Sequence, residues 1–413
     1  MVFDLVLHNG IVLTVNSEFD ILPEGLICIR NGVIESIVPA DSDTPHPPAK
    51  QILNADGGII MPGLVNTHTH LPMTLFRGLA DDLPLQEWLN EHIFPAESTQ
   101  IHSASVRNGT SLGCMEMLRS GTTTCCDGYF LENEVAEAVL ETGLRAVLGQ
   151  GVIDFPAPGV PDPANNIRTA SDFVEKWTGR SDRITPSVFC HSPYTCSEET
   201  LKKAKMLAAE KGLLFQIHVA ETKSEHERIL AEKGLSPVQY LDRLGILDEA
   251  TLLVHAVWTD EADREIIAER KSKISHNPES NMKLASGVAA VPEFLKAGIT
   301  VGLGTDGCAS NNNLDLFREM DTTAKLHKVN TRDPTVMDAR TVIRMATIEG
   351  AKCLGMDHMI GSLEVGKQAD IIVIDTAKPH LVPMYHPESH VVYAVSGGDV
   401  RNVMVGGEVK GWS

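Results

Sequence analysis

The sequence is short of positive charge and has no long hydrophobic run. Its 35 lysines and arginines are outnumbered by 55 aspartates and glutamates, which gives a formal net charge of −20. This balance argues against a polyanion such as nucleic acid as the main partner, although it allows an uncharged nucleoside. No stretch approaches the roughly 18 consecutive apolar residues that a membrane helix needs. We therefore expect neither nucleic acid nor a membrane as a partner.

Two further absences bear on the compartment. The start of the chain, MVFDLVLHNG, meets Asp4 before any apolar region develops, so we expect no secretory signal peptide. The eight cysteines are scattered and form no C-x-x-C pair. Such a distribution is typical of buried, reduced thiols. The sequence thus favours a cytoplasmic protein.

Both ends of the 413-residue chain carry short strand patterns. Near the start, DLVLHNGIVLTV and GLICIRNGVIESIV alternate apolar and polar residues, and each contains Asn-Gly, a strong hairpin signal. The tail is similar, with ADIIVIDT and VVYAVSGGDVRNVMVGGEVKGW. We expect residues 1–57 and 361–413 to form the two parts of one small β-sandwich domain.

The middle of the chain alternates strand patterns with amphipathic helical ones, such as SVRNGTSLGCMEMLRSG and EETLKKAKMLAAEKG. The strand candidates number eight: GIIMPGLVNTH, GTTTCCDG, LRAVLGQGVID, ITPSVFCHSP, LLFQIHVAE, ATLLVHAV, SKISHNP and ITVGLGTD. Eight such units predict an α/β fold, namely a parallel (β/α)₈ TIM barrel over residues 58–360. We take this barrel to be the catalytic domain.

Polar residues collect where the predicted barrel strands end. They are His68, His70, His191, His218, Glu221, His255, His276, Asn277 and Asp306. Active sites of TIM barrels lie at the carboxyl ends of the strands. Scattered, solvated histidines would show no such preference, so these residues are candidates for one site.

The pair His68-x-His70 is a candidate metal site. Residues i and i+2 of a strand point to the same side, so both rings can face one point. Alone, the pair fits a metal site and two ordinary polar residues at the end of a strand equally well. With His218 and Asp306 from other strand ends, it completes three imidazoles and a carboxylate, a set typical of Zn²⁺ that also suits Fe²⁺. We predict one such ion per subunit.

Glu221, His255 and Asp306 are the candidate catalytic residues. A bound metal lowers the pKa of its water to about 7, so a nucleophile is available at neutral pH. Asp306 can accept a proton from that water, and His255 can hydrogen-bond it and the oxyanion that follows. Glu221 can carry a proton to and from the substrate. By spacing alone, Glu221 fits a solvated helix cap equally well.

Three other motif matches fail on their context. GLGTDG at 302–307 matches G-x-G-x-x-G, but it closes the strand series instead of opening a doubly wound sheet. GSLEVGKQ at 361–368 nearly matches a phosphate loop, but Gln368 replaces Ser or Thr and a strand follows. HERIL at 226–230 lacks the second histidine of a helical zinc protease motif.

The chain resembles the amidohydrolase superfamily over essentially its whole length. The matching segments are MPGLVNTHTHLPMTLFRGLADDLPLQEWLNEHIFPAE, FQIHVAET, HNPESNMKLASG, GLGTDG and GSLEVGKQADIIVID. A carboxylated bridging lysine is missing from the strand ends, which indicates the mononuclear branch. Within it, the long first segment with Trp88 and Glu97 is most similar to 5'-methylthioadenosine/S-adenosylhomocysteine deaminases.

The resemblance implies hydrolytic deamination of an adenine nucleoside to an inosine-type product and ammonia. It places the metal on His68, His70, His218 and Asp306, and it assigns the catalytic roles to Glu221 and His255. It also implies that Glu97 binds the ribose hydroxyls, that His191 contacts the purine or ribose, and that Trp88 belongs to the nucleoside site. Without the resemblance, Glu97 reads as a surface helix residue. By analogy with related barrels, we expect a homo-oligomer.

One region departs from the pattern that the resemblance implies. Such deaminases commonly carry arginines after the third strand, near the ribose or the 5' substituent. Here the region reads GQGVIDFPAPGVPDPANNIRTA. Gln150 and Asn166 lie near the expected places, and Arg168 is the only arginine. The sequence therefore leaves the preferred 5' group open.

Two alternatives also stay open from the sequence. The same metal ligands suit the hydrolysis of another aminated or halogenated ring, such as guanine, 8-oxoguanine or a chloro-s-triazine. From a different class, some amidohydrolase-like chains are non-catalytic assembly proteins. Those typically lack the ligand set that this chain retains.

Overall fold

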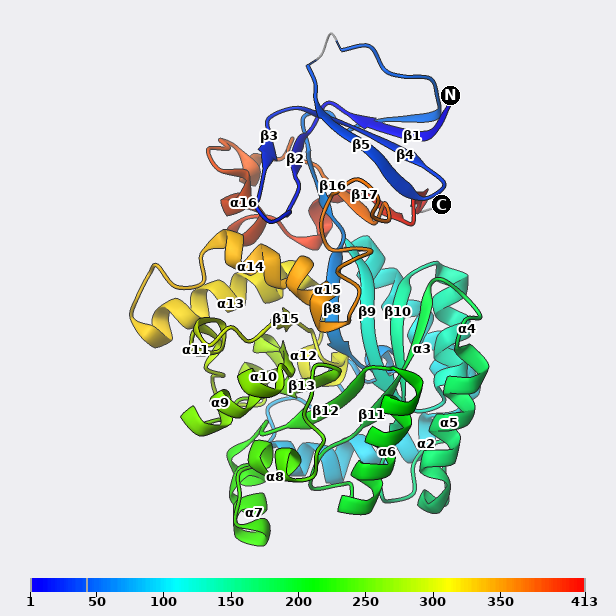
Figure 1. Cartoon of the computed structure of the whole chain (residues 1–413), viewed down its shortest axis with the longest axis vertical. Coiled ribbons are helices and arrows are strands. Elements are labelled where there is room, and N and C mark those ends of the chain that lie inside the picture. Colours follow the sequence, from blue (N-terminus) through cyan, green and yellow to red (C-terminus); the bar gives the residue numbers. More distant parts are fainter. Residues whose placement is uncertain (1, 42–43, 412–413) are drawn as a thin grey trace. The chain divides into compact units, whose positions relative to one another are not determined.

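The computed structural model describes residues 2–41 and 44–411 (Figure 1). The chain forms two compact units. One comprises Asn66–Met115 and Cys125–Leu314, and the other contains the rest of the chain, with both of its ends. The domain boundaries predicted at 57/58 and 360/361 stay predictions.

Eight parallel strands form one sheet whose spatial order follows the chain from first to last, as in a TIM barrel. These strands are β8 (Leu64–Thr69), β9 (Thr122–Tyr129), β10 (Arg145–Val152), β11 (Ile184–Cys190), β12 (Phe215–Val219), β13 (Thr251–His255), β14 (Lys273–His276) and β15 (Val301–Leu303). The ends of the sheet meet where the Asp306 amide donates to the His68 carbonyl oxygen at 3.0 Å. The predicted (β/α)₈ barrel is confirmed.

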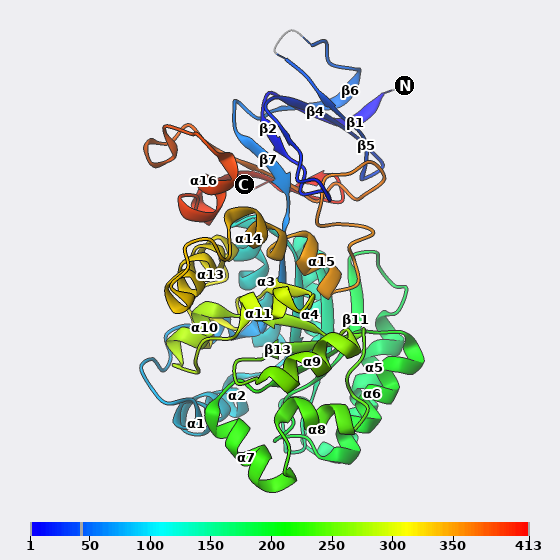
Figure 2. The same ribbon diagram turned by 60° about the vertical axis from the view of Figure 1, so that its left-hand side comes forward.

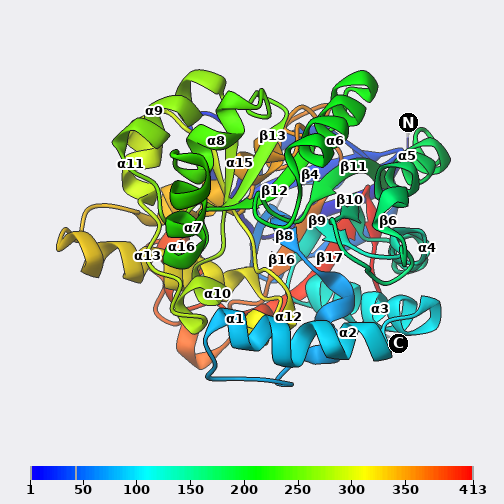
Figure 3. The ribbon, with the colours of Figure 1, turned by 90° about the horizontal axis from the view of Figure 1, so that it is seen from below.

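Helices follow the barrel strands, and α4, α5 and α6 pack on β10, β11 and β12. Figure 3 shows them around the strands. The α-helices are α1 (Leu85–Glu87), α2 (Phe94–Gln100), α3 (Ser103–Arg119), α4 (Glu132–Thr142), α5 (Asn166–Trp177), α6 (Glu198–Lys211), α7 (Lys223–Lys233), α8 (Pro237–Arg243), α9 (Glu261–Arg270), α10 (Pro278–Lys283), α11 (Val291–Lys296), α12 (Cys308–Asn311), α13 (Leu316–Thr331), α14 (Ala339–Met345), α15 (Ile348–Cys353) and α16 (Pro387–Tyr393). The short helical turns are η1 (Leu71–Phe76), η2 (Trp88–Ile93), η3 (Pro163–Asn165), η4 (Pro379–Leu381) and η5 (Gly397–Asp399). None of the described helices is long and apolar enough to cross a membrane.

The first predicted barrel strand, GIIMPGLVNTH, is two strands. Its first part is β7 (Ile59–Pro62), which pairs with the C-terminal strand β16 (Ile371–Ile374), and only β8 enters the barrel. The break falls at Gly63, where a Cβ would lie 2.7 Å from the Cβ of Thr123. An apolar run does not reveal such a change of sheet, because both halves are buried.

Both chain ends contribute to a pair of sheets, as predicted. One sheet has the order β5-β4-β1-β6 and the other β18-β17-β16-β7-β2-β3. The strands not yet given are β1 (Phe3–His8), β2 (Ile11–Leu13), β3 (Ile21–Leu22), β4 (Gly25–Arg30), β5 (Val33–Pro39), β6 (Ala49–Asn54), β17 (Val400–Val405) and β18 (Glu408–Val409). Figure 2 shows the blue N-terminal strands beside the orange and red C-terminal segments. Leu7, Ile29, Ile371 and Met404 belong to one buried cluster that joins the two sheets.

Of the two predicted hairpins, one is confirmed and one is wrong. Asn31-Gly32 connects β4 and β5, and both residues have the positive φ that such a tight turn requires. Asn9-Gly10 does not make a hairpin, because β1 pairs with β4 and β6 while β2 pairs with β3 and β7. At that point the chain passes from one sheet to the other.

All eight cysteines are buried and none forms a disulfide, as expected. Cys125 and Cys126 lie in β9, where both are fully buried. The thiols therefore pack as small apolar side chains.

Candidate active site

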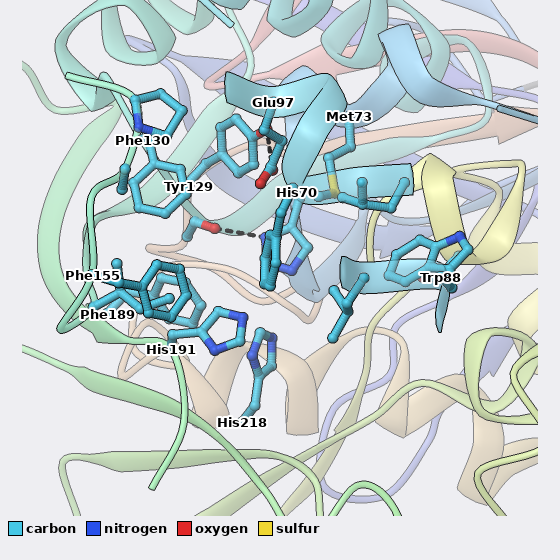
Figure 4. Close-up of a pocket in the computed structure, with 18 of the residues that line it drawn as sticks. His70, Met73, Trp88, Glu97, Tyr129, Phe130, Phe155, Phe189, His191 and His218 are labelled. Atoms are coloured by element: carbon cyan, nitrogen blue, oxygen red, sulfur yellow. Dashed lines mark hydrogen bonds between the residues drawn. The ribbon is translucent and has the colours of Figure 1, made fainter. Parts of the chain in front are cut away.

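A pocket of about 490 Å³ lies at the carboxyl ends of the barrel strands. Its lining includes Trp88, Glu97 and six of the nine strand-end candidates, and a seventh, His68, is buried beside them. Figure 4 shows His70, His191 and His218 grouped in this pocket, with Glu97 and Tyr129 on one side and Trp88 on another. The structure thus brings together the predicted metal-binding, catalytic and substrate-binding residues, whereas His276 and Asn277 lie outside the lining.

The four predicted metal ligands converge. His68 Nε2 lies 3.2 Å from His218 Nε2 and 3.5 Å from Asp306 Oδ1. His70 Nε2 lies 3.4 Å from the same Asp306 oxygen. Two triads have the spacing to hold a metal ion, namely His68, His70 and Asp306, and His68, His218 and His255, so the four predicted ligands do not form a single group with that spacing. His255 is therefore a candidate ligand as well, which the sequence did not suggest.

The protonation of these histidines fits metal binding. Burial lowers the pKa of His68 to about 4 and that of His218 well below its usual value. Both rings are thus neutral at pH 7, which is the form that binds a metal. The His70 ring donates from Nδ1 to the Gly128 carbonyl oxygen at 2.6 Å, so its Nε2 lone pair faces the site. The donor set fits a divalent metal ion.

Asp306 is held in place from several sides. Its Oδ2 accepts hydrogen bonds from Ser280 at 2.6 Å and Ser310 at 2.9 Å, and its Oδ1 accepts from the Gly307 amide at 2.8 Å. Burial opposes ionisation, but the hydrogen bond from His68 and the neighbouring histidines hold its pKa well below the usual value. Its φ of 60° is unusual for an aspartate, which is typical of strained functional positions.

Glu221 and His255 face each other in the pocket. Glu221 Oε2 lies 3.9 Å from His255 Nε2, and burial raises the pKa of the Glu221 carboxyl. His255 Nδ1 lies 2.8 Å from Asn281 Oδ1 and 3.2 Å from Asn277 Nδ2, so two asparagines hold the ring with Nε2 toward Glu221. The backbone amide of Glu221 donates to Glu225 at 2.9 Å, which fixes the turn after β12.

Glu97 is a buried residue of the pocket and not a surface residue. It is 5% exposed, and its Oε1 accepts a hydrogen bond from Tyr129 Oη at 2.5 Å. Burial raises the pKa of Glu97 to about 7, although the tyrosine bond acts in the opposite direction. A carboxyl group with this pKa changes its charge near neutral pH.

Trp88 and His191 line the same pocket from different elements. Trp88 begins η2, a π-helical turn between α1 and α2; such turns often occur at functional sites. His191 follows β11, and its Nδ1 bonds to Thr195 Oγ1 at 2.9 Å. Burial, and then the nearby His70, lower the pKa of His191 to about 3, so its ring is neutral.

Sequence reasoning missed the side chains that hold the predicted residues. Tyr129 fixes Glu97, Ser280 and Ser310 fix Asp306, and Asn281 fixes His255. Ser280 and Asn281 lie just after His276 and Asn277 in the HNPESN segment. This closeness in sequence to two strand-end candidates is the signal that could have indicated their supporting role. His276 and Asn277 themselves are buried and do not line the pocket.

Comparison with known proteins identifies the family. The amidohydrolase family pattern matches residues 59–410, most of the chain. The chain belongs to the amidohydrolase family. This amidohydrolase is 48% identical over 406 residues to a 5-methylthioadenosine/S-adenosylhomocysteine deaminase of Syntrophobacter fumaroxidans, which covers 98% of this chain and 92% of that protein.

Two further relatives are similar over nearly their whole length. A 5'-deoxyadenosine deaminase of Methanothermobacter thermautotrophicus is 46% identical over 378 residues, 91% of this amidohydrolase and 86% of that protein. The crystal structure of a zinc-bound adenosine deaminase from Xanthomonas campestris superposes with a TM-score of 0.96 at 36% identity, covering 99% of this chain and 93% of that one.

Proposed function

We propose that this amidohydrolase is a metal-dependent deaminase that hydrolyses the 6-amino group of adenine nucleosides. The substrates would be 5'-methylthioadenosine, S-adenosylhomocysteine, adenosine or 5'-deoxyadenosine, and the products an inosine-type nucleoside and ammonia. The observation that carries the proposal is that one pocket combines a convergent metal-ligand group with a buried carboxyl, Glu97, suited to ribose hydroxyls. The names of the relatives support the same reaction.

We assign the metal to His68, His70, His218 and Asp306. Zn²⁺ is the proposed ion, because neutral imidazoles and a carboxylate are ligands that it prefers, and Fe²⁺ accepts the same set. When bound, the ion lowers the pKa of water and so supplies a nucleophile at neutral pH. His255 is close enough to serve as a ligand in another arrangement, but its contact with Glu221 favours a catalytic role.

The chain's own residues handle the protons of the reaction. Water adds to C6 of the adenine ring, the C6–N bond breaks, and ammonia leaves. Glu221 donates a proton to N1, so that negative charge does not build up on the ring as water adds, and it takes back the remaining proton of the added hydroxyl as the amine leaves. Asp306 accepts a proton from the attacking water and returns it to the leaving amine, and His255 hydrogen-bonds the water and the oxygen that replaces the amine. General acid–base help of this kind is worth roughly 10²–10⁴-fold in rate for each transfer.

Glu97, His191 and Trp88 would bind the nucleoside. A carboxylate can accept hydrogen bonds from two neighbouring hydroxyls at once, which suits Glu97 for the 2' and 3' positions of ribose. His191, neutral and held by Thr195, would contact the purine or ribose. A free base such as guanine has no ribose, so Glu97 favours a nucleoside.

A substrate panel tests the proposal. The purified protein is assayed for ammonia release from adenosine, 5'-deoxyadenosine, 5'-methylthioadenosine, S-adenosylhomocysteine and guanine, and for chloride release from a chloro-s-triazine. We expect ammonia from at least one nucleoside, no ammonia from guanine and no chloride from the triazine. Turnover of guanine alone would overturn the nucleoside assignment. A homo-oligomer and a cytoplasmic location stay predictions, and light scattering tests the first.

A further inference from the structure

The charge of the pocket is one-sided. Among the described residues that line it, three carry carboxyl groups, Glu97, Glu221 and Asp306, and none is a lysine or arginine. Apart from the proposed metal ion, a negatively charged group that entered this pocket would find no lysine or arginine among these residues to pair with.

One wall of the pocket is an apolar loop between β10 and η3. It contributes Ile153, Phe155, Pro156, Ala157, Pro158 and Pro161 to the lining. Phe155 packs edge-on against Phe94 of α2, with ring centres 5.6 Å apart, and Phe94 in turn lies 6.5 Å from the His191 ring. Figure 4 labels Phe155, Phe189 and His191 among the residues that line the pocket. This wall therefore borders His191 and α2, the helix that carries Glu97. Both of these residues are proposed to contact the nucleoside.

The loop is tied down. The Asp154 carboxylate accepts hydrogen bonds from the Ser197 amide at 2.6 Å, from Thr200 Oγ1 at 2.7 Å and from Asn166 Nδ2 at 3.2 Å. Ala157 and Val160 exchange backbone hydrogen bonds at 2.9 and 3.1 Å, which closes the loop on itself. Its prolines restrict it further.

The polar side chains around this loop already bond to other protein groups or lie outside the pocket. The Gln150 side chain accepts from the Glu132 amide at 3.2 Å, and Asn166 holds the Ile153 carbonyl oxygen at 3.2 Å. Arg168 is exposed and lies outside the lining. Arg228 stacks over the outer pocket residue Tyr194 but pairs with Glu232 at 2.9 Å. None of these four residues therefore supplies a positive charge inside the pocket.

We propose that the pocket selects adenine nucleosides with an uncharged, apolar 5' substituent and discriminates against those that end in an amino acid. This inference rests on the proposed deaminase function and narrows its substrates. A methylthio or 5'-deoxy group gains apolar contact with the Phe155 wall. The carboxylate of a homocysteine tail would lose water there without gaining a lysine or arginine as its partner. A buried charge without a partner lowers binding by roughly 10²–10³-fold.

Three substrates separate charge from length. They are 5'-methylthioadenosine, S-adenosylhomocysteine, and 5'-butylthioadenosine, which has a tail as long as homocysteine but no charge. We expect kcat/KM for the butylthio compound within about tenfold of the methylthio compound, and kcat/KM for S-adenosylhomocysteine roughly 10²-fold lower or more. Equal values for S-adenosylhomocysteine and 5'-methylthioadenosine would overturn the proposal. So would a butylthio compound as poor as S-adenosylhomocysteine, because length would then be the cause.

A variant tests the wall itself. Phe155→Arg adds a cation, and we expect it to raise kcat/KM for S-adenosylhomocysteine relative to 5'-methylthioadenosine by at least about tenfold. The matched variant Phe155→Leu keeps the wall apolar, and the preference for the methylthio compound should remain. An unchanged preference in Phe155→Arg would contradict the placement of the 5' group. If none of the nucleosides released ammonia, the deaminase function itself would fail, and this proposal with it.

Discussion

At the scale of single residues, two carboxyl groups share one pocket but face different partners. Glu221 faces His255, and Glu97 accepts a hydrogen bond from Tyr129. Burial raises the pKa of both. Their surroundings suggest different tasks: proton transfer for Glu221 and hydroxyl binding for Glu97.

Glu221→Gln tests the proton transfer. The amide keeps the shape of the side chain but has no acidic proton to transfer to the substrate, so we expect kcat to fall by roughly 10²–10⁴-fold. The metal content, measured by elemental analysis, should stay that of the parent protein, because Glu221 is not an assigned ligand. Normal turnover by this variant would refute the assignment.

Glu97 predicts a pH dependence of substrate binding. Its pKa of about 7 means that the group is largely neutral at pH 6 and largely ionised at pH 8. The ionised form accepts hydroxyl hydrogen bonds more strongly, so KM for a nucleoside should fall as the pH rises through 7. Steady-state kinetics across this range measure it, and Glu97→Gln, which cannot ionise, should abolish the change.

Tyr129→Phe extends this test. The tyrosine bond lowers the pKa of Glu97, so its removal should move the midpoint of the KM profile to higher pH. A tyrosine with a merely structural role would change the overall activity and leave the midpoint where it was. An unmoved midpoint would therefore count against the proposed coupling.

The sequence predicted the site residues better than the side chains that hold them in place by hydrogen bonds. His68 and His70 are one residue apart on a strand, and the other site histidines end predicted strands, so periodicity and strand order suffice to bring them together. The bond between Tyr129 and Glu97 joins residues 32 positions apart. Nothing in the local pattern of either residue encodes how α2 lies on β9.

At the scale of elements, Gly63 is the point where one apolar run becomes two strands. β7 pairs with β16, and β8 enters the barrel immediately after it. The Thr123 side chain fills the space where a Cβ at position 63 would lie. The run GIIMPGLVNTH could not show this, because strand periodicity is lost when both faces are buried.

Gly63→Ala should destabilise the protein. The added methyl group must displace Thr123 in a packed interior, at a cost of about 1–3 kcal/mol or more. We expect a lower Tm by calorimetry. Gly398→Ala is the matched control, because its Cβ would meet only Ser396 Oγ at 3.7 Å. A Tm for Gly63→Ala equal to that of the control would contradict this packing argument.

At the scale of the whole molecule, we expect the folding of the protein to be coupled to the binding of the proposed metal ion. The proposed ligands come from β8, from β12 and from the residues that follow β8 and β15. They converge only in the folded barrel, so the ion binds the native state alone and stabilises it. At a free metal concentration 100 times Kd, this linkage is worth about 2.7 kcal/mol.

Removal of the metal should therefore lower both activity and Tm. We expect a chelator to abolish ammonia release and lower the Tm, and added Zn²⁺ to restore both. His68→Ala should contain little metal by elemental analysis, and its Tm should respond little to the chelator. A parent protein that kept full activity after verified metal loss would exclude a catalytic ion.

The proposed reaction replaces the 6-amino group by hydrolysis, and isotope labelling measures this replacement directly. The protein is incubated with 5'-methylthioadenosine in ¹⁸O-labelled water, and the products are examined by mass spectrometry and ammonia assay. We expect an intact inosine-type nucleoside with one ¹⁸O at C6 and one ammonia per product molecule. Release of free adenine, or a product without ¹⁸O, would contradict it.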